Sequence, residues 1–196
     1  MISTLKFWLG LGRVFGATQG GLLSVLFTTW VIGALGQQGI ATDNIIGGVI
    51  GAAIMVIFSS KAGIKVACDH PYIATVMLEV SCLASVVIMA SGVNPWVILV
   101  TECAVTMILG AGFFQTRKAL LHRKVYGDTL TQMTNQLDII SMICALCGSG
   151  LAMVVPATLD AMAISILIAS SCMFPINMMQ VKVLLAMPDL KMEKSE

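Results

Sequence analysis

Charged residues are scarce in this chain. Asp, Glu, Lys and Arg make up 11% of its 196 residues, whereas hydrophobic residues make up 58%, and the mean hydropathy is +0.95. A water-soluble chain of this length and composition would be covered in apolar surface. The composition therefore excludes a soluble domain and predicts that lipid surrounds the protein.

Basic residues are missing from three of the turns that separate six apolar segments, namely residues 36–44, 91–95 and 156–160. The eleven Lys and Arg residues lie around the start of the first segment, in the other two loops or after the sixth segment: Lys6, Arg13, Lys61, Lys65, Arg117, Lys118, Arg123, Lys124, Lys182, Lys191 and Lys194. Cytoplasmic loops of membrane proteins carry an excess of Lys and Arg. The pattern predicts a six-span protein with both termini in the cytoplasm.

Six helices of about 20 residues, each crossing a hydrocarbon layer of about 30 Å, account for most of the chain. The predicted fold is all-α and polytopic, with one transmembrane domain over residues 1–180 and a polar cytoplasmic tail over 181–196. Pro71 and the Asn94-Pro95 pair suit helix starts, and Pro175 is expected to kink the last turn of the sixth helix. The predicted spans are 7–35, 45–60, 71–91, 95–114, 134–155 and 159–179.

Glycines recur at four-residue spacing in the first two predicted spans. Gly12, Gly16 and Gly20 fall near one face of the first helix, and Gly47 and Gly51 share a face of the second. Because glycine lets neighbouring backbones approach closely, this spacing predicts tight packing of these two helices.

Motifs for covalent or cofactor chemistry are absent. The sequence contains no phosphate-binding glycine loop outside the apolar segments, no hydrolytic triad and no paired zinc ligands. None of the six cysteines lies in an outward loop, and Cys144 and Cys147 form a C-x-x-C without a nearby histidine, a weak metal or redox signal. We therefore expect no enzyme, no cofactor, no metal and no nucleic-acid partner, with the cysteines acting as small apolar packing residues.

Ionisable side chains inside predicted spans are the candidates for function, because each is disfavoured by about 2.5 to 3.5 kcal/mol in lipid. These are Arg13, Glu79, Glu102 and Asp138, and Gln19 adds a neutral polar group. Glu102 lies deepest and cannot easily reach water, so it is the first candidate for proton coupling or cation binding. An interhelical hydrogen bond remains the alternative for Glu102, and a structural ion pair with Asp138 or Glu79 remains the alternative for Arg13.

The run GAGFFQTRKALL over residues 110–121, followed by Gly127, Thr131, Asn135 and Gln136, resembles a segment of major facilitator superfamily transporters. The likeness is greatest to lysophospholipid-transporter-like members, and it covers roughly residues 7–180. It implies one six-helix half of such a carrier. It also implies that the first and fourth spans line a central cavity, with Arg13, Gln19 and Glu102 as lining residues.

Two functions follow as hypotheses. One is a half-size secondary transporter of the bacterial cytoplasmic (inner) membrane, which moves an amphiphilic or small organic solute with protons by alternating access as a homo-oligomer or with a second membrane subunit. The other is a non-transporting membrane subunit or scaffold of a larger envelope complex. The loop over residues 59–72 favours the second hypothesis, because it lacks the family's signature rich in glycine, acid and arginine.

Overall fold

The computed structural model describes residues 2–39, 68–102 and 119–188, and all regular structure within these ranges is helical. The described elements are α1 (Ile2–Gly36), α3 (Pro71–Ala90), α4 (Pro95–Glu102), α6 (Gly127–Leu151) and α7 (Leu159–Ala186), together with a short helical segment at residues 119–124. The predicted all-α class is confirmed for these ranges. The second predicted span and residues 103–114 of the fourth lie outside the described residues.

Three helices, α1, α3 and α7, are long and apolar enough to cross a membrane. α6 is longer than α3, but polar side chains such as Gln132, Asn135 and Asp138 fill its first half and are exposed there. The membrane-spanning character predicted from composition is thus supported by three of the described helices.

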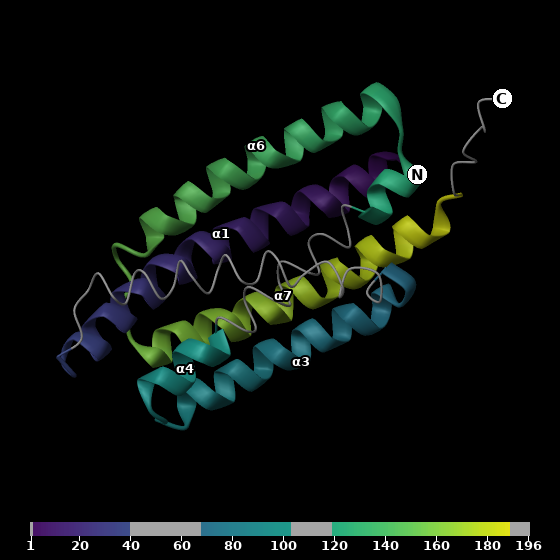
Figure 1. The fold of residues 1–196 in the computed structure, drawn as a ribbon. Helices are drawn as coiled ribbons and strands as arrows, with labels where there is room; N and C mark the ends of the chain where they lie inside the picture. Colours follow the sequence, from purple (N-terminus) through teal and green to yellow (C-terminus); the bar gives the residue numbers. More distant parts are fainter. Residues whose placement is uncertain (1, 40–67, 103–118, 189–196) are drawn as a thin grey trace.

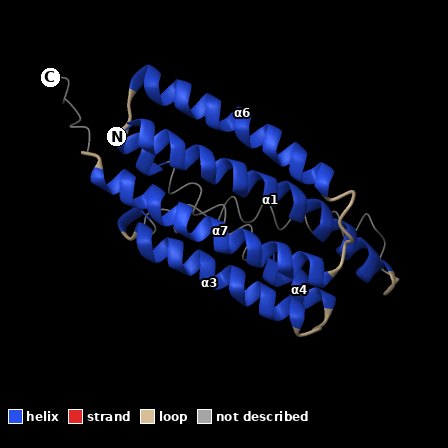
Figure 2. Cartoon of the chain, turned by 180° about the vertical axis from the view of Figure 1, so that it is seen from behind, coloured by secondary structure: helices blue, strands red, loops and turns tan. Residues whose placement is uncertain are grey.

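The helices lie side by side in the order α6, α1, α7, α3, with α4 turned back beside α3 (Figures 1 and 2). α1 contacts both α6 and α7, and α7 also contacts α3. α1, α3 and α6 run in one direction and α7 runs in the other (Figure 1). α1 is therefore the central element of the described bundle.

Helix starts follow local chemistry. Asn94 Oδ1 accepts a hydrogen bond from the Trp96 backbone N–H at 2.9 Å, and Thr158 Oγ1 accepts one from the Ala161 N–H at 3.2 Å. Pro71 occupies the first turn of α3, where its missing N–H costs nothing. These caps place α3, α4 and α7 at the starts that the sequence predicts.

The end of α7 differs from the predicted span. The helix continues past residue 179 to Ala186, and Pro175 lies inside it. Val181 and Leu184 are fully buried, so residues 181–186 belong to the packed helix rather than to the predicted tail. The Gln180 and Lys182 side chains interrupt the apolar run and conceal this continuation in the sequence.

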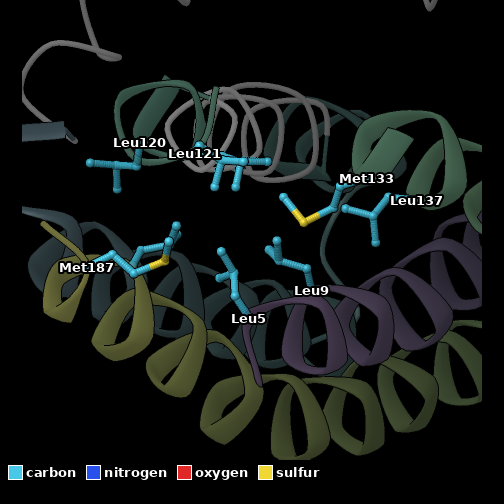
Figure 3. Close-up of a cluster of buried hydrophobic side chains, with 9 residues drawn as sticks. Leu5, Leu9, Leu120, Leu121, Met133, Leu137 and Met187 are labelled. Carbon is cyan, nitrogen blue, oxygen red and sulfur yellow. The ribbon is translucent and has the colours of Figure 1, made fainter. Parts of the chain in front are cut away.

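Two apolar clusters hold the ends of the bundle. The basal cluster joins both ends of the described chain with the segment between α4 and α6, and Figure 3 shows it; it comprises Leu5, Leu9, Leu120, Leu121, Val125, Met133, Leu137, Leu184 and Met187. The distal cluster lies at the other end and comprises Leu26, Met89, Ile98, Ala152, Met162, Ala163 and Ile166. Leu120, Leu121 and Val125, which the sequence assigns to a loop, are therefore core residues.

The closest approach of two backbones is between α1 and α6. A Cβ on Gly21 would collide with the Ala145 carbonyl oxygen, and a Cβ on Gly148 would collide with the Thr18 carbonyl oxygen. Both sides of this crossing therefore require glycine. Gly21 and Gly148 were not among the packing glycines that the sequence indicated.

The predicted glycine face of α1 contacts α7, and its packing against the second predicted span stays a prediction. Gly12 meets the Gln180 and Ile176 side chains of α7, and a Cβ on Gly16 would lie 3.4 Å from Met173 Cε. Gly20 has no described atom within 4 Å of a Cβ and is exposed. Four-residue steps advance about 40° beyond a full turn, so Gly20 lies about 80° away from Gly12. Gly47 and Gly51 lie outside the described residues.

We predict that Gly21→Ala destabilises the protein by about 1–3 kcal/mol, because its methyl group forces α1 away from α6. Thermal unfolding in mild detergent, followed by tryptophan fluorescence, measures the effect. Gly33→Ala on the exposed face of the same helix is the matched control and should leave the melting temperature unchanged or slightly raised. Equal melting temperatures for the two variants would contradict the close crossing.

Candidate functional site

An ion pair joins α1 to α6 just above the basal cluster. Arg13 Nη2 lies 3.8 Å from Asp138 Oδ1, and the side chains are 24% and 56% exposed, respectively. The sequence left Asp138 and Glu79 open as partners of Arg13, and the structure pairs Arg13 with Asp138. At this distance the pair is a charge contact rather than a short hydrogen bond.

Gln180 forms the second polar contact, between α7 and α1. It is fully buried, and its Nε2 donates a hydrogen bond of 2.7 Å to the Trp8 carbonyl oxygen. The amide lies over Gly12, where a Cβ would collide with Nε2. Glycine at position 12 therefore makes room for a polar side chain to reach the backbone of the neighbouring helix.

Gln180 is not among the site residues predicted from the sequence, because the predicted sixth span ends at residue 179 and the polar tail follows it. A signal was nevertheless present. The spacing of Ile176, Gln180 and Leu184 continues one helical stripe, and all three side chains are buried. A polar residue within such a stripe points to an interhelical hydrogen bond.

The other predicted site residues are more dispersed. Gln19 is half-buried on α1 and shares the α7-facing side with Gly12, since seven residues return a helix to within about 20°. Glu79 is half-buried on α3, which packs on α7 and not against the α1–α6 pair. Glu102 ends the described part of α4, and its side chain lies outside the described residues. The structure thus pairs Arg13 of α1 with Asp138 of α6, whereas Glu79 lies on α3.

Near the basal end, the segment over residues 119–124 is attached to the end of α7. Lys124 Nζ donates a hydrogen bond of 2.7 Å to the Met187 carbonyl oxygen, which lies just past the last turn of α7. Cationic groups are favourable at a helix C-terminus. This contact reinforces the apolar packing of Leu120 and Leu121.

The cysteines of the described residues are free thiols. Burial raises the pKa of the Cys68 thiol, and the positive charge of Arg123 opposes this effect only in part. A thiol with a raised pKa remains protonated and weakly reactive at neutral pH. Within the described ranges, no group of three His, Cys, Asp or Glu side chains could hold a metal ion.

Comparisons with protein-family models, with curated proteins and with solved structures found no match to this chain. The polar contacts of α1 therefore carry the functional argument by themselves.

We predict energetic coupling between Gly12 and Gln180. Gly12→Ala pushes the Gln180 amide off the Trp8 carbonyl and should lower stability, but the loss should shrink by about 0.5–3 kcal/mol in a Gln180→Ala background. Unfolding in mild detergent of the two single variants and the double variant measures this difference.

Gly16→Ala is the matched control for this cycle. Its Cβ would meet only the flexible end of Met173, at an ordinary contact distance. It should cost little and show no coupling to Gln180→Ala. Additive effects of Gly12→Ala and Gln180→Ala would show that the two sites do not contact each other.

Proposed function

We propose that the chain is one six-helix half of a secondary transporter, resembling half of a major facilitator carrier. Two copies form a homodimer in a bacterial cytoplasmic membrane and move an amphiphilic or small organic solute with protons by alternating access. The observation that carries this proposal is the half-exposed Asp138 carboxylate, paired with Arg13.

The directions of the described helices support six spans. α1 and α3 run parallel, and so do α3 and α6 (Figure 1). In the six-span arrangement that we propose, α1, α3 and α6 are the first, third and fifth spans, and odd-numbered spans run parallel to one another.

The distribution of charge supports the orientation. Lys6, Lys124 and Lys182 lie on elements that meet in the basal cluster, whereas Asp160 lies at the distal start of α7. Positive charge favours the cytoplasmic side. The basal end, where both ends of the described chain meet, is therefore assigned to the cytoplasm.

The depth of Asp138 follows from helix length. The 20 residues of α3 match a hydrocarbon layer of about 30 Å, and Met89 near its end packs in the distal cluster with Ala152 of α6. Asp138 precedes Ala152 by about 21 Å of helix, at 1.5 Å per residue, which leaves it about 9 Å inside the layer.

A carboxylate at this depth is unfavourable against lipid by a few kcal/mol, yet 56% of the Asp138 side chain is exposed. Its open side therefore faces a water-filled cavity or another protein. A second copy of the chain provides both, because a carrier cavity lies between two halves.

The loose geometry of the pair suits a carrier. Arg13 lies 3.8 Å from Asp138 without holding it in a short hydrogen bond, so a cationic solute group can approach the same carboxylate. Gln19 and Glu102 complete the proposed lining, Gln19 from α1 and Glu102 from the end of the described part of α4.

A non-transporting membrane subunit is the second candidate, and the same exposed face favours it. The open side of Asp138 and the neighbouring Asn135 and Gln136 of α6 also suit a lasting contact with a different membrane protein. The rigid α1–α6 crossing at Gly21 and Gly148 fits a scaffold. The two candidates differ in solute flux and in the composition of the particle.

Asp138→Asn should reduce proton-coupled uptake at least about tenfold, because loss of a charge relay typically costs two or more orders of magnitude. Proteoliposomes tested with a panel of amphiphilic and small organic solutes measure it, and Glu102→Gln tests the second carboxylate in the same way. Asp160→Asn, exposed at the distal end, is the matched control and should transport like the wild type. Undiminished flux with Asp138→Asn would contradict the assigned role.

The particle mass tests the assembly. Light scattering in mild detergent, corrected for bound detergent, should give twice the chain mass of 20.7 kDa. A stoichiometric complex with unrelated membrane proteins would support the subunit instead, and a monomer under native-like conditions would contradict both assignments of the Asp138 face.

A further inference from the structure

Buried polar side chains gather between α3 and α7. The described residues contain five buried polar side chains on these two helices, and one of them, Gln180, reaches α1. We call the other four the α3–α7 seam: Thr75, Ser85, Ser170 and Asn177. Apolar side chains would be the simpler filling for such an interface, so the polar groups need hydrogen-bond partners.

The antiparallel packing of α3 and α7 sorts the seam into two levels. Met89 of α3 packs with Ala163 and Ile166 of α7 in the distal cluster. Because the two helices are antiparallel, a move of one residue toward the N-terminus of α3 corresponds to a move of one residue toward the C-terminus of α7. Four steps from Met89, Ser85 therefore lies level with residues 167–170 of α7, which include Ser170; fourteen steps from Met89, Thr75 lies level with residues 177–180, which include Asn177.

One atom at each level has no protein hydrogen-bond partner. These are Asn177 Oδ1 and Ser85 Oγ, on residues that are each 1% exposed, and neither finds a partner within the described part of the chain. Their neighbours are already engaged, since Thr75 Oγ1 donates to the Pro71 carbonyl at 2.9 Å and Gln180 Nε2 donates to Trp8. Such an unpaired buried group is unfavourable, because it has lost its hydrogen bonds to water.

We propose that the α3–α7 seam binds internal water at both levels, with one molecule held by Asn177 Oδ1 and another by Ser85 Oγ. Water donates to the amide oxygen and can bond in turn to the free lone pairs of Thr75 and Ser170 at the same levels. Buried waters typically make about three hydrogen bonds to groups of this kind. The seam contains no carboxylate, so its chemistry selects a neutral ligand over a metal cation.

The proposal does not depend on transport. It identifies a hydrated site inside a helix pair that composition marks as membrane-spanning. Glu79 lies on α3 between the two levels, one turn from Thr75. The seam water is thus an internal source of exchangeable protons close to this carboxylate.

X-ray hydroxyl-radical footprinting of the full chain in mild detergent tests the sites, because radicals form from water and label side chains that touch it. Val181, one turn from Asn177 on the same side of α7, is the reporter, and Val31 of α1 is the matched control, as both valines are buried. Val181 should be oxidised several-fold faster than Val31. Equal rates in the wild type would overturn the proposal without any variant.

Asn177→Leu supplies the second measurement, since leucine matches the volume but cannot hold water. If the variant folds, oxidation of Val181 should fall to the rate of Val31. An unchanged Val181 rate would mean that Asn177 does not hold the water. A rise in melting temperature of the wild type when sodium replaces choline in the buffer would assign the seam to a cation and also overturn the proposal.

Discussion

The structure depends on the two glycine faces of α1. Nine residues separate Gly12 from Gly21, which turns a helix by about 180°, so the two glycines open opposite sides of α1. Gly21 admits the backbone of α6, and Gly12 admits the side chain of Gln180 from α7. In lipid, where the hydrophobic effect does not drive helices together, such close contact supplies the packing energy. The place of α1 between α6 and α7 follows from these faces.

The polar contacts cluster where α1 leaves the basal cluster. Arg13 meets Asp138 on the α6 side, and Gln180 reaches Trp8 on the α7 side. The Arg13–Asp138 contact is partly exposed and the Gln180–Trp8 contact is buried, so the two contacts have different roles. The buried amide locks two helices together, whereas the exposed carboxylate requires water or a further protein beside it.

Local sequence signals predicted several features correctly. Pro71 and the Asn94-Pro95 pair mark helix starts because caps and proline act through neighbouring backbone groups. The all-α class followed from composition, since only helices and closed barrels satisfy the backbone in lipid. Arg13 and Asp138 were identified as candidates because charge within an apolar segment stands out without any knowledge of packing.

Features that depend on the relation between helices could not be predicted. The sequence places Gln180 at the start of the tail, whereas in the structure its amide packs on Gly12 of α1. The sequence places Leu120 in a loop, whereas in the structure it is part of the basal cluster. Gly148 carried no signal of its own, because its role depends on Thr18 in a helix more than a hundred residues away.

The sequence by itself determined that the chain is helical, that it belongs in a membrane and which ionisable groups are costly there, because these properties depend on composition and local order along one helix. Only the tertiary structure decided which helices are neighbours, that Arg13 meets Asp138 rather than Glu79, and that Asn177 Oδ1 and Ser85 Oγ lie buried without a hydrogen-bond partner among the described residues. Those outcomes depend on the rotation and level of each helix against the next, and residue spacing within a single helix does not encode them.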